Sequence, residues 1–416
     1  MTDFDKIRED FPMLKREING KRIIYLDNAA TTFKPDQVID AVNDYYKNKC
    51  ANINRGNHIL SDEATEIYEN ARKTIAGLIN ANKDEIIFTS NATHAINMIS
   101  SSGFCRDGNV ISSVLEHHSN MLPWINNTEA RFAGMDDKGL LKLDDYETLI
   151  DDETRLITIN HLSNVTGIIN PIDKIINIAH KRKIPVLIDA TQSVPHINID
   201  VKELGCDFMA FSGHKMLGPT GIGVLYARKE VIDKIDPVFT GGGMVKDVSL
   251  ENVSLNKASD LQDKINANVR YKDGTEKLEP GTPNIAGAVG LAAAADYLKN
   301  IGLSAIERHE KNLLRLALDL IKDMNGIKDY NLSEVGTNNR INIIPFNIKN
   351  IRAGDTALML NNRSNIMVRG GYLCAQPLCE RLFCGKVIRA SSYIYNTEDD
   401  IRIFADTIKK IRNGFV

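Results

Sequence analysis

The sequence lacks the features of a membrane, secreted or nucleic-acid-binding protein. Its nearest candidate for a membrane helix, the Ala- and Gly-rich stretch 285–298, is shorter than the roughly 18 apolar residues that such a helix needs. The first residues are charged from position 3 and carry no apolar stretch of the signal-peptide kind. The 51 basic and 54 acidic residues give a net charge of -3, too small to favour nucleic acid or an anionic membrane as a partner. We therefore expect a cytoplasmic protein.

Cysteine is scarce, and its spacing argues against a metal site. The six cysteines form no CxxC pair, and Cys374, Cys379 and Cys384 recur every five residues, which does not suit one helix face. Few cysteines without an export signal are typical of a reducing compartment with free thiols. Neither a P-loop nor a GxGxxG fingerprint is present, so nucleotide binding is disfavoured. We expect no bound metal.

What the sequence does contain is an alternation of β-branched runs and helical patterns from about residue 60 to 300. Pro171 and Pro185 bound one helical segment, and Ser61 is placed to cap another. The alternation predicts an α/β fold whose mainly parallel sheet is covered by helices. Strands are expected at 85–89, 109–114, 156–160, 186–190, 207–212 and 222–227.

Beyond about residue 300, long charged helices replace this alternation. The last of them opens with a capping box of Thr397 and Asp400 and closes at Gly414. We expect a large α/β domain at 26–297. A smaller α+β domain would combine the N-terminal arm, 1–25, with residues 298–416.

Reactive side chains follow the apolar runs at the points where strands are expected to end. Ligands of open α/β sheets bind beyond the carboxyl ends of the strands. Singly, each side chain has a structural explanation, such as a turn aspartate or a solvated lysine. Together they predict a cofactor site. They are Thr89, Asn91, Thr93, Glu116, His117, His118, His161, Asn164, Asp189, Gln192, Ser212, His214 and Lys215.

The collective pattern fits pyridoxal phosphate. Lys215 would supply the amine for a Schiff base, and Asp189 the carboxylate that keeps the ring nitrogen protonated. His117 would offer a flat imidazole to stack on the ring. Donors for the phosphate would come from Thr93, Ser212 and His214.

Short blocks spread along nearly the whole chain make the sequence similar to a known family. The blocks are YLDNAATTFKP, RGNHILS, HLSNVTG, IDATQSVPH, FSGHKMLGPTGIGVLY, GTPN, RGGYLCAQP and RASSYIYNT. Their order resembles that of class V, fold-type I enzymes that depend on pyridoxal phosphate. Within that class the chain most resembles the SufS-type, group II cysteine desulfurases, which convert L-cysteine to L-alanine and an enzyme-bound persulfide. The resemblance implies sulfur transfer to an acceptor protein or thiol, for iron-sulfur cluster or other thio-cofactor assembly.

The resemblance also implies a role for each matching residue. The catalytic residues would be Lys215, Cys374 and His117. Cofactor-binding residues would be Thr93, His117, Asn164, Asp189, Gln192, Ser212, His214, Lys215 and, from the second subunit of a homodimer, Thr282. The substrate would lie against Ala29, Ala30, Asn164, Arg369 and Arg389, with the guanidinium of Arg389 clamping the carboxylate.

Cys374 is the expected nucleophile. Pro377 and the residues after it predict a helix that starts just beyond Cys374, and the N-terminal end of a helix favours the thiolate form. The chain departs from the family at Leu373, where histidine is usual. It departs again in the phosphate loop, where Asn91 and Ala92 replace glycine and threonine and His94 replaces an acid.

Alternatives stay open at this point. The same fold carries out selenocysteine lyase, cysteine sulfinate desulfinase and class V aminotransferase reactions. A non-catalytic sulfur-relay or scaffold subunit is disfavoured by the intact Lys215, Asp189 and Arg389. A metal-binding module is disfavoured by the absence of ligand spacing.

Overall fold

A seven-stranded sheet forms the centre of the computed structural model, which describes residues 3–54, 56–251, 266–328, 330, 332–341 and 343–414. Neighbouring strands run parallel except β10, which is antiparallel to the strands on both sides. The order across the sheet is β4 (Ile86–Thr89), β10 (Gly223–Ala227), β9 (Phe208–Ser212), β8 (Val186–Asp189), β7 (Thr154–Asn160), β5 (Asn109–Ser113) and β6 (Glu129–Ala133).

The six strands expected from sequence are all present in this sheet, and one strand of the sheet was missed. The missed strand, β6, has the sequence EARFA and is partly exposed along most of its length. It is the end strand of the sheet, so one edge pairs with no other strand of that sheet, and its charged residues hide the apolar pattern of a buried strand.

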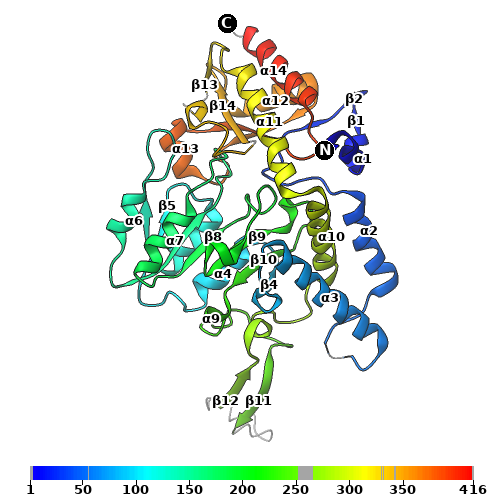
Figure 1. The fold of residues 1–416 in the computed structure, drawn as a ribbon, viewed down its shortest axis with the longest axis vertical. Helices are drawn as coiled ribbons and strands as arrows, with labels where there is room; N and C mark the ends of the chain where they lie inside the picture. The colour runs from blue at the N-terminus through cyan, green and yellow to red at the C-terminus, as the bar shows by residue number, and fades with distance from the viewer. Residues whose placement is uncertain are drawn as a thin grey trace, which may run out of the picture.

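Helices cover both faces of this sheet, because side chains alternate between two apolar clusters along each strand. Ile86, Ile157 and Ile188 belong to one cluster, whereas their neighbours Ile87 and Leu156 belong to the other. The helices of this region are α2 (Asp36–Asp44), α3 (Ile59–Leu78), α4 (Ala92–Ser101), α5 (Leu122–Asn127), α6 (Leu143–Leu149), α7 (Ile172–Lys181), α8 (Val201–Leu204), α9 (Lys229–Ile232) and α10 (Ile285–Ile301). In Figure 1, α2, α3 and α10 lie together on one side of the sheet.

Helix ends test the capping predictions. The helix that follows Pro171 and the Thr397/Asp400 capping box are confirmed. The prediction for Ser61 is wrong, because α3 begins at Ile59 with His58 as its N-cap. The Ser61 hydroxyl instead donates 2.9 Å to the carbonyl of Asn52, a bond that ties the preceding loop to the helix.

The C-terminal part forms a second, smaller layer at the top of Figure 1. Its antiparallel sheet has the order β13 (Ile327–Lys328), β14 (Ile343–Ile348), β17 (Val387–Ser391) and β16 (Arg369–Gly371). The helices here are α11 (Leu303–Ile321), α12 (Ala353–Ser364), α13 (Gln376–Phe383) and α14 (Glu398–Asn413). From the N-terminal arm, β3 (Ile24–Tyr25) pairs with β15 (Ile366–Met367).

Two separate cores correspond to these layers. Ile24 and Leu26 pack with the C-terminal core, whereas Phe11 from the same arm packs with the core of the large sheet. Helix α10 continues to Ile301, past the predicted boundary at 297. The division into 26–297 and 1–25 with 298–416 stays a prediction.

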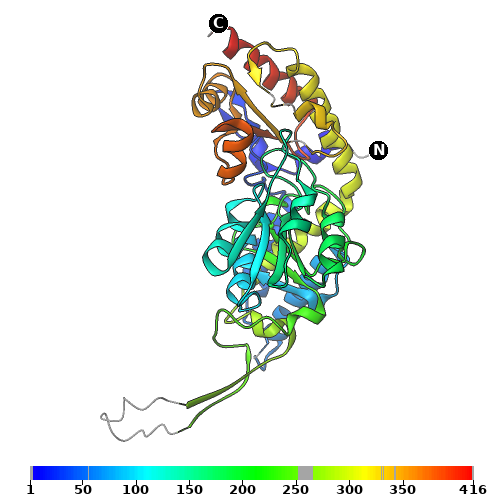
Figure 2. The same cartoon turned by 90° about the vertical axis from the view of Figure 1, so that its left-hand side faces the viewer.

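The remaining elements are short, apart from one ribbon. Figure 2 shows the two-stranded ribbon of β11 (Val245–Glu251) and β12 (Asn266–Tyr271) extending away from the body. Within the part of the chain that the structure describes, every helix is too short or too polar to traverse a bilayer. The other helical and strand segments are α1 (Phe4–Glu9), β1 (Glu17–Ile18), β2 (Lys21–Arg22), η1 (Pro12–Lys15), η2 (Tyr45–Lys49), η3 (Lys83–Glu85), η4 (His118–Asn120), η5 (Gly213–Lys215), η6 (Gly274–Leu278) and η7 (Leu332–Val335).

Candidate active site

A cavity of about 570 Å³ lies where the carboxyl ends of the central strands meet the small C-terminal sheet. Of the strand-end residues expected from sequence, Thr89, Glu116, His118 and His161 do not line it. The residues to which the family resemblance assigns a role do line it, except Thr282. They are Ala29, Ala30, Thr93, His117, Asn164, Asp189, Gln192, Ser212, His214, Lys215, Arg369, Cys374 and Arg389.

Lys215 and Asp189 form the floor of the cavity. Asp189 is the last residue of β8, and Lys215 ends the turn η5 that follows β9. Burial lowers the pKa of Lys215 to about 8; Arg389 acts in the same direction and Asp189 opposes it. Burial raises the pKa of Asp189, while the backbone N–H of Thr191, 3.0 Å from Oδ1, and the charge of Lys215 oppose that rise. The floor therefore pairs an amine that is readily deprotonated with a carboxyl that gains from a cationic neighbour.

His117 and Gln192 form the walls above this floor. Burial lowers the pKa of His117 to about 3, helped by the charge of Lys215, so the imidazole is neutral near pH 7. Its Nδ1 accepts the backbone N–H of Ser119 at 3.1 Å, which fixes the ring. Gln192 donates from Nε2 to the carbonyl of Ala29 at 2.8 Å.

One end of the cavity has the features of an anion site. Helix α4 begins at Ala92, and the N–H of Ala92 donates to Ser212 Oγ at 2.9 Å. The hydroxyls of Thr93 and Ser119 are 2.7 Å apart. A helix N-terminus with convergent hydroxyl groups suits phosphate. Burial lowers the pKa of His214, also on this wall, to about 4.

The opposite end holds two arginines that share one carboxylate. Arg369 and Arg389 are register partners on β16 and β17. Asp27 accepts from Arg369 NH2 at 2.7 Å and from Arg389 NH2 at 3.1 Å. Arg389 NH1 donates to the carbonyl of Asn164 at 2.9 Å, and Nε is buried with no hydrogen-bond partner among the described residues. Arg389 therefore keeps a free donor for a second carboxylate.

The Cys374 loop closes the cavity from the small sheet. Leu373 and Cys374 both have φ of 54°, a left-handed conformation that is costly for residues with a side chain. Asn164 Nδ2 donates to the carbonyl of Leu373 at 2.9 Å, and the N–H of His118 donates to the carbonyl of Cys374 at 2.6 Å. The Cys374 side chain is exposed and lines the cavity.

The environment of Leu373 explains how a loop with this strain is held. Its side chain is buried in an apolar cluster with Leu115, Val165 and Leu378. Helix α13 begins at Gln376, just beyond Cys374, as expected from Pro377. Leucine in place of histidine thus puts an apolar anchor next to an exposed thiol. The other two cysteines of this segment do not line the cavity. Cys379 is buried, and Cys384 is exposed at the C-terminal end of α13.

Sequence reasoning missed Asp27, and it singled out His118 and Glu116 without giving either a role. Asp27 joins the two arginines, and only its place in the block YLDNAATTFKP could have drawn attention to it. His118 holds the Cys374 loop, because its Nε2 also accepts from the N–H of Gln376 at 3.3 Å. Glu116 is buried behind the site, where Ser113 and Asn120 bind it and burial raises its pKa to about 8.

Thr282 lies elsewhere in the chain. It is exposed and lines a separate cavity of about 730 Å³ beside α3 and η6. Arg55, in the block RGNHILS, lies outside the described residues.

Comparison with known proteins identifies the family. The aminotransferase class-V model matches residues 24–404. The chain belongs to the aminotransferase class-V family. It is 41% identical to a Halalkalibacterium halodurans protein named probable cysteine desulfurase, over 99% of this chain and 98% of the relative. It is 35% identical to a Haloferax volcanii cysteine desulfurase, over 100% and 98%.

Solved structures agree with these relatives. A cysteine desulfurase from Thermococcus onnurineus superposes with a TM-score of 0.88 at 34% identity, covering 99% of this chain and 98% of that one. The Escherichia coli cysteine desulfurase CsdA gives a TM-score of 0.85 at 30% identity, with both chains covered completely. The protein is thus a cysteine desulfurase of the α/β, fold-type I class, and its cofactor is pyridoxal phosphate.

The residues of the cavity fit this cofactor. Gln192 Oε1 and Thr191 Oγ1 are buried in its wall without a hydrogen-bond partner in the described part of the chain. Buried polar atoms are normally paired, so these atoms fit a polar ligand in the cavity. The amine of Lys215, the carboxyl of Asp189 and the anion-binding end lie on the walls of the same cavity.

Proposed function

We propose that Cys374 accepts the sulfur of L-cysteine, with L-alanine as the other product. A new S–S bond forms between the Cys374 sulfur and the substrate sulfur, while the substrate C–S bond breaks. The carbon keeps the electron pair of that bond and gains a proton, so cysteine plus thiol becomes alanine plus persulfide. The observation that carries this proposal is an exposed Cys374 lining one cavity with Lys215 and Arg389.

The side chains around the cavity divide the work. Lys215 holds the cofactor and moves the proton of the substrate Cα, a task suited to an amine whose pKa is about 8. Asp189 would keep the ring nitrogen of the cofactor protonated, and the neutral imidazole of His117 would offer a flat surface to the ring. Arg389 binds the substrate carboxylate through the donor that Asp27 leaves free. Bound pyridoxal phosphate supplies the electron sink for this chemistry.

The other residues bind and orient. Asn164 and Gln192 would lie near the phenolic oxygen of the cofactor, and Ala29 and Ala30 would border the substrate together with Arg369. The phosphate is held by Thr93, Ser212, His214 and, from a second subunit, Thr282.

A product assay tests the reaction. The purified protein, supplied with pyridoxal phosphate, L-cysteine and a reducing thiol, should form alanine and sulfide in equal amounts. Alanine without sulfide, or an amine passed to a 2-oxo acid, would contradict the proposal and favour another class V reaction.

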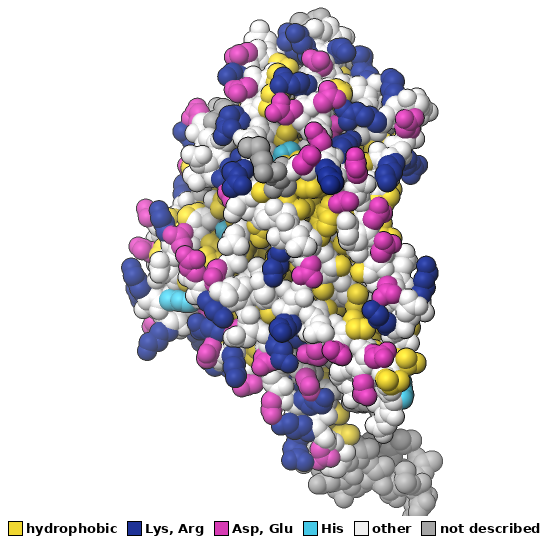
Figure 3. Space-filling model, turned by 45° about the vertical axis from the view of Figure 1, so that its right-hand side comes forward, with side chains coloured by type: hydrophobic (Ala, Val, Ile, Leu, Met, Phe, Trp, Pro, Cys, Tyr) yellow, Lys and Arg dark blue, Asp and Glu magenta, His cyan; other side chains and the backbone are white. Residues whose placement is uncertain are grey.

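We also infer a homodimer whose sites are shared between subunits. Figure 3 shows hydrophobic side chains gathered on the face that carries α2, α3 and α10. Exposed large apolar residues on α2, η2 and α3 are Ile39, Tyr46, Ile59 and Leu60. Exposed apolar patches of this kind mark interaction sites. Thr282 is exposed on the same protomer and lies outside its own active-site cavity, as a residue serving a neighbour must.

Thr282→Ala tests the shared site. The variant should remain a dimer by light scattering but lose pyridoxal phosphate faster on gel filtration. A monomer with full activity would contradict the homodimer.

From the exposed Cys374, the sulfur would pass to an acceptor protein or thiol in the cytoplasm, for iron-sulfur cluster or other thio-cofactor assembly.

A further inference from the structure

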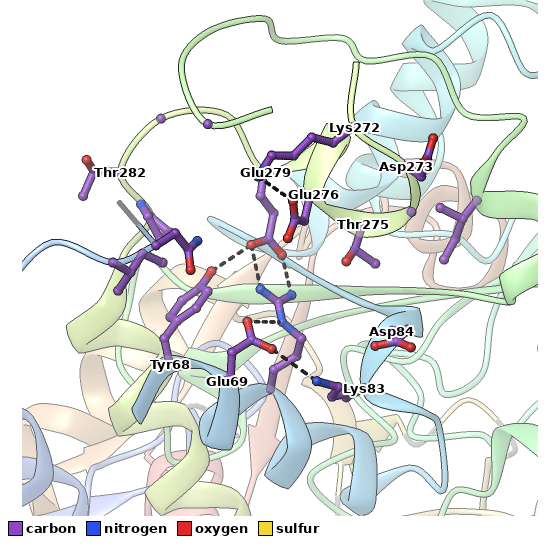
Figure 4. A pocket seen from close by; sticks show the side chains of 18 of the residues that line it. Tyr68, Glu69, Lys83, Asp84, Lys272, Asp273, Thr275, Glu276, Glu279 and Thr282 are labelled. Carbon is purple, nitrogen blue, oxygen red and sulfur yellow. Dashed lines mark hydrogen bonds and ion pairs between the residues drawn. The ribbon is translucent and has the colours of Figure 1, made fainter. Parts of the chain in front are cut away.

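A half-buried carboxylate, that of Glu279, lies three residues before Thr282. Each oxygen of Glu279 accepts two hydrogen bonds, from donors that come from a helix and a strand. Oε1 accepts from Arg72 NH1 and from the backbone N–H of Phe88, both at 2.7 Å. Oε2 accepts from Arg72 NH2 and from the hydroxyl of Tyr68, both at 2.9 Å. Figure 4 shows the Glu279 side chain reaching from the Thr282 segment to the hydroxyl of Tyr68.

The donors that hold Glu279 are themselves fixed. Arg72 is 7% exposed, packs over the rings of Tyr68 and Phe88, and donates to the carbonyl of Ile86 at 2.7 Å. The carboxylate raises the pKa of Arg72 against the effect of burial, so the guanidinium is charged in the folded protein. Arg72 and Glu279 therefore form a paired, fully hydrogen-bonded ionic contact, which is the kind that holds one geometry.

The turn that carries Thr282 is fixed at its other end as well. Asn284 caps α10 by accepting from the N–H of Gly287 at 2.8 Å, and its Nδ2 donates to the carbonyl of Gly221 at 2.8 Å. Between the two anchors, Gly281 has φ of 79° and donates to the carbonyl of Gly242 at 2.7 Å. The Thr282 side chain is exposed between these fixed points.

We propose that Glu279, held by Arg72 and Tyr68, is a positioning residue that aims Thr282 into the active site of the second subunit. This inference rests on the shared-site dimer proposed above. Its consequence is that a change at Glu279 harms the neighbour's site and leaves the site of its own subunit intact.

Glu279→Gln removes the charge and puts an NH₂ group in place of one carboxylate oxygen. That NH₂ group cannot accept hydrogen bonds, so it faces two of the four donors without a partner for them. The homodimer of this variant should bind pyridoxal phosphate roughly 10- to 100-fold more weakly, the scale of a misplaced contact. The backbone N–H groups of residues 280–284 should exchange hydrogen faster. Tyr68→Phe, which removes one of four hydrogen bonds, provides a milder variant if Glu279→Gln folds poorly. It should weaken binding in the same direction.

Mixed dimers separate a positioning role from a merely structural one. Subunits of Glu279→Gln are paired with subunits of Lys215→Ala by co-expression with two affinity tags. Lys215 then remains only in the Glu279→Gln subunit. The site of that subunit receives Thr282 from the Lys215→Ala subunit, in which Glu279 is intact. Borohydride fixes the cofactor to that lysine, and mass spectrometry gives the fraction of Lys215 modified at limiting pyridoxal phosphate. We expect the fraction to return to the wild-type value.

A matched control comes from a second buried pair, His196 and Glu310, 2.8 Å apart and far from the turn in sequence. Any loss of cofactor binding in Glu310→Gln should persist in mixed dimers, because that pair acts within its own subunit. The inference is wrong if mixed dimers restore cofactor binding to Thr282→Ala but not to Glu279→Gln. The shared site would still stand in that case. If neither variant is rescued, the shared site is wrong too. Full cofactor binding by the Glu279→Gln homodimer would also overturn the inference.

Discussion

The floor of the active-site cavity and the Cys374 loop are held in different ways. Asp189 and Ser212 end strands that are buried along their whole length in the middle of a seven-stranded sheet. The loop around the thiol is not part of a strand. Leu373 and Cys374 adopt left-handed backbone angles, and their carbonyl groups accept hydrogen bonds from Asn164 and His118. One region is fixed by the fold, and the other is fixed by a few contacts.

This difference matches two parts of the chemistry. Binding and polarising a substrate requires groups that stay in place during the reaction. Carrying sulfur out to an acceptor requires a thiol that is reached from solvent and held by contacts of low total energy. We therefore expect the floor to activate the substrate and Cys374 to take away the sulfur.

Asp189→Asn should break the floor without disturbing the loop, and its expected effect on turnover is larger than that of a change at Leu373. The amide cannot stabilise a protonated ring nitrogen, so alanine formation should fall roughly 10- to 100-fold, the scale of a lost hydrogen bond to a charged group. Steady-state assays would measure this, with bound cofactor quantified by absorbance. Unchanged kinetics would return Asp189 to the role of a turn residue.

Leu373→Ala should break the loop without disturbing the floor. The variant opens a cavity in the apolar cluster around Leu373, so the free energy of unfolding should fall by about 2–5 kcal/mol in denaturant titrations. Persulfide formation should slow several-fold while the cofactor content stays constant. Leu378→Ala is the matched control, because it lies in the same cluster on α13 and should lower stability with a smaller effect on sulfur transfer. Equal kinetic effects of both variants would contradict the anchoring role.

The pH dependence of Lys215 reactivity tests whether the floor is desolvated. Its expected effect, a shift of one titration midpoint, is the smallest of the three. Burial lowers its pKa from 10.5 to about 8, and only the uncharged amine reacts with an acylating reagent. In the apoprotein, competitive acetylation of Lys215 should rise through pH 8 and level off above it, as measured by mass spectrometry. In Asp189→Asn the midpoint should move to lower pH. The carboxylate of Asp189 stabilises the ammonium form of Lys215, and this variant removes it. A wild-type midpoint near 10.5 would show that Lys215 is not desolvated.

The sequence predicts the floor well and the loop poorly, for physical reasons. Each floor residue directly follows a β-branched run, and strand order brings such positions to one edge of the sheet. Asp27 is 362 residues from Arg389, so no local pattern announces their contact. Adjacent histidines hide the separate role of His118. Leu373 could be read only as a missing proton donor, because its burial depends on neighbours distant in sequence.

Mass spectrometry after a single turnover with L-cysteine shows directly which cysteine takes the sulfur. The account predicts one added sulfur atom on the peptide that contains Cys374, and none on Cys379 or Cys384. In Cys374→Ser, sulfide release should be lost while cofactor content is unchanged. A persulfide on another cysteine, or a Cys374→Ser variant as active as wild type with no added sulfur anywhere, would contradict the account.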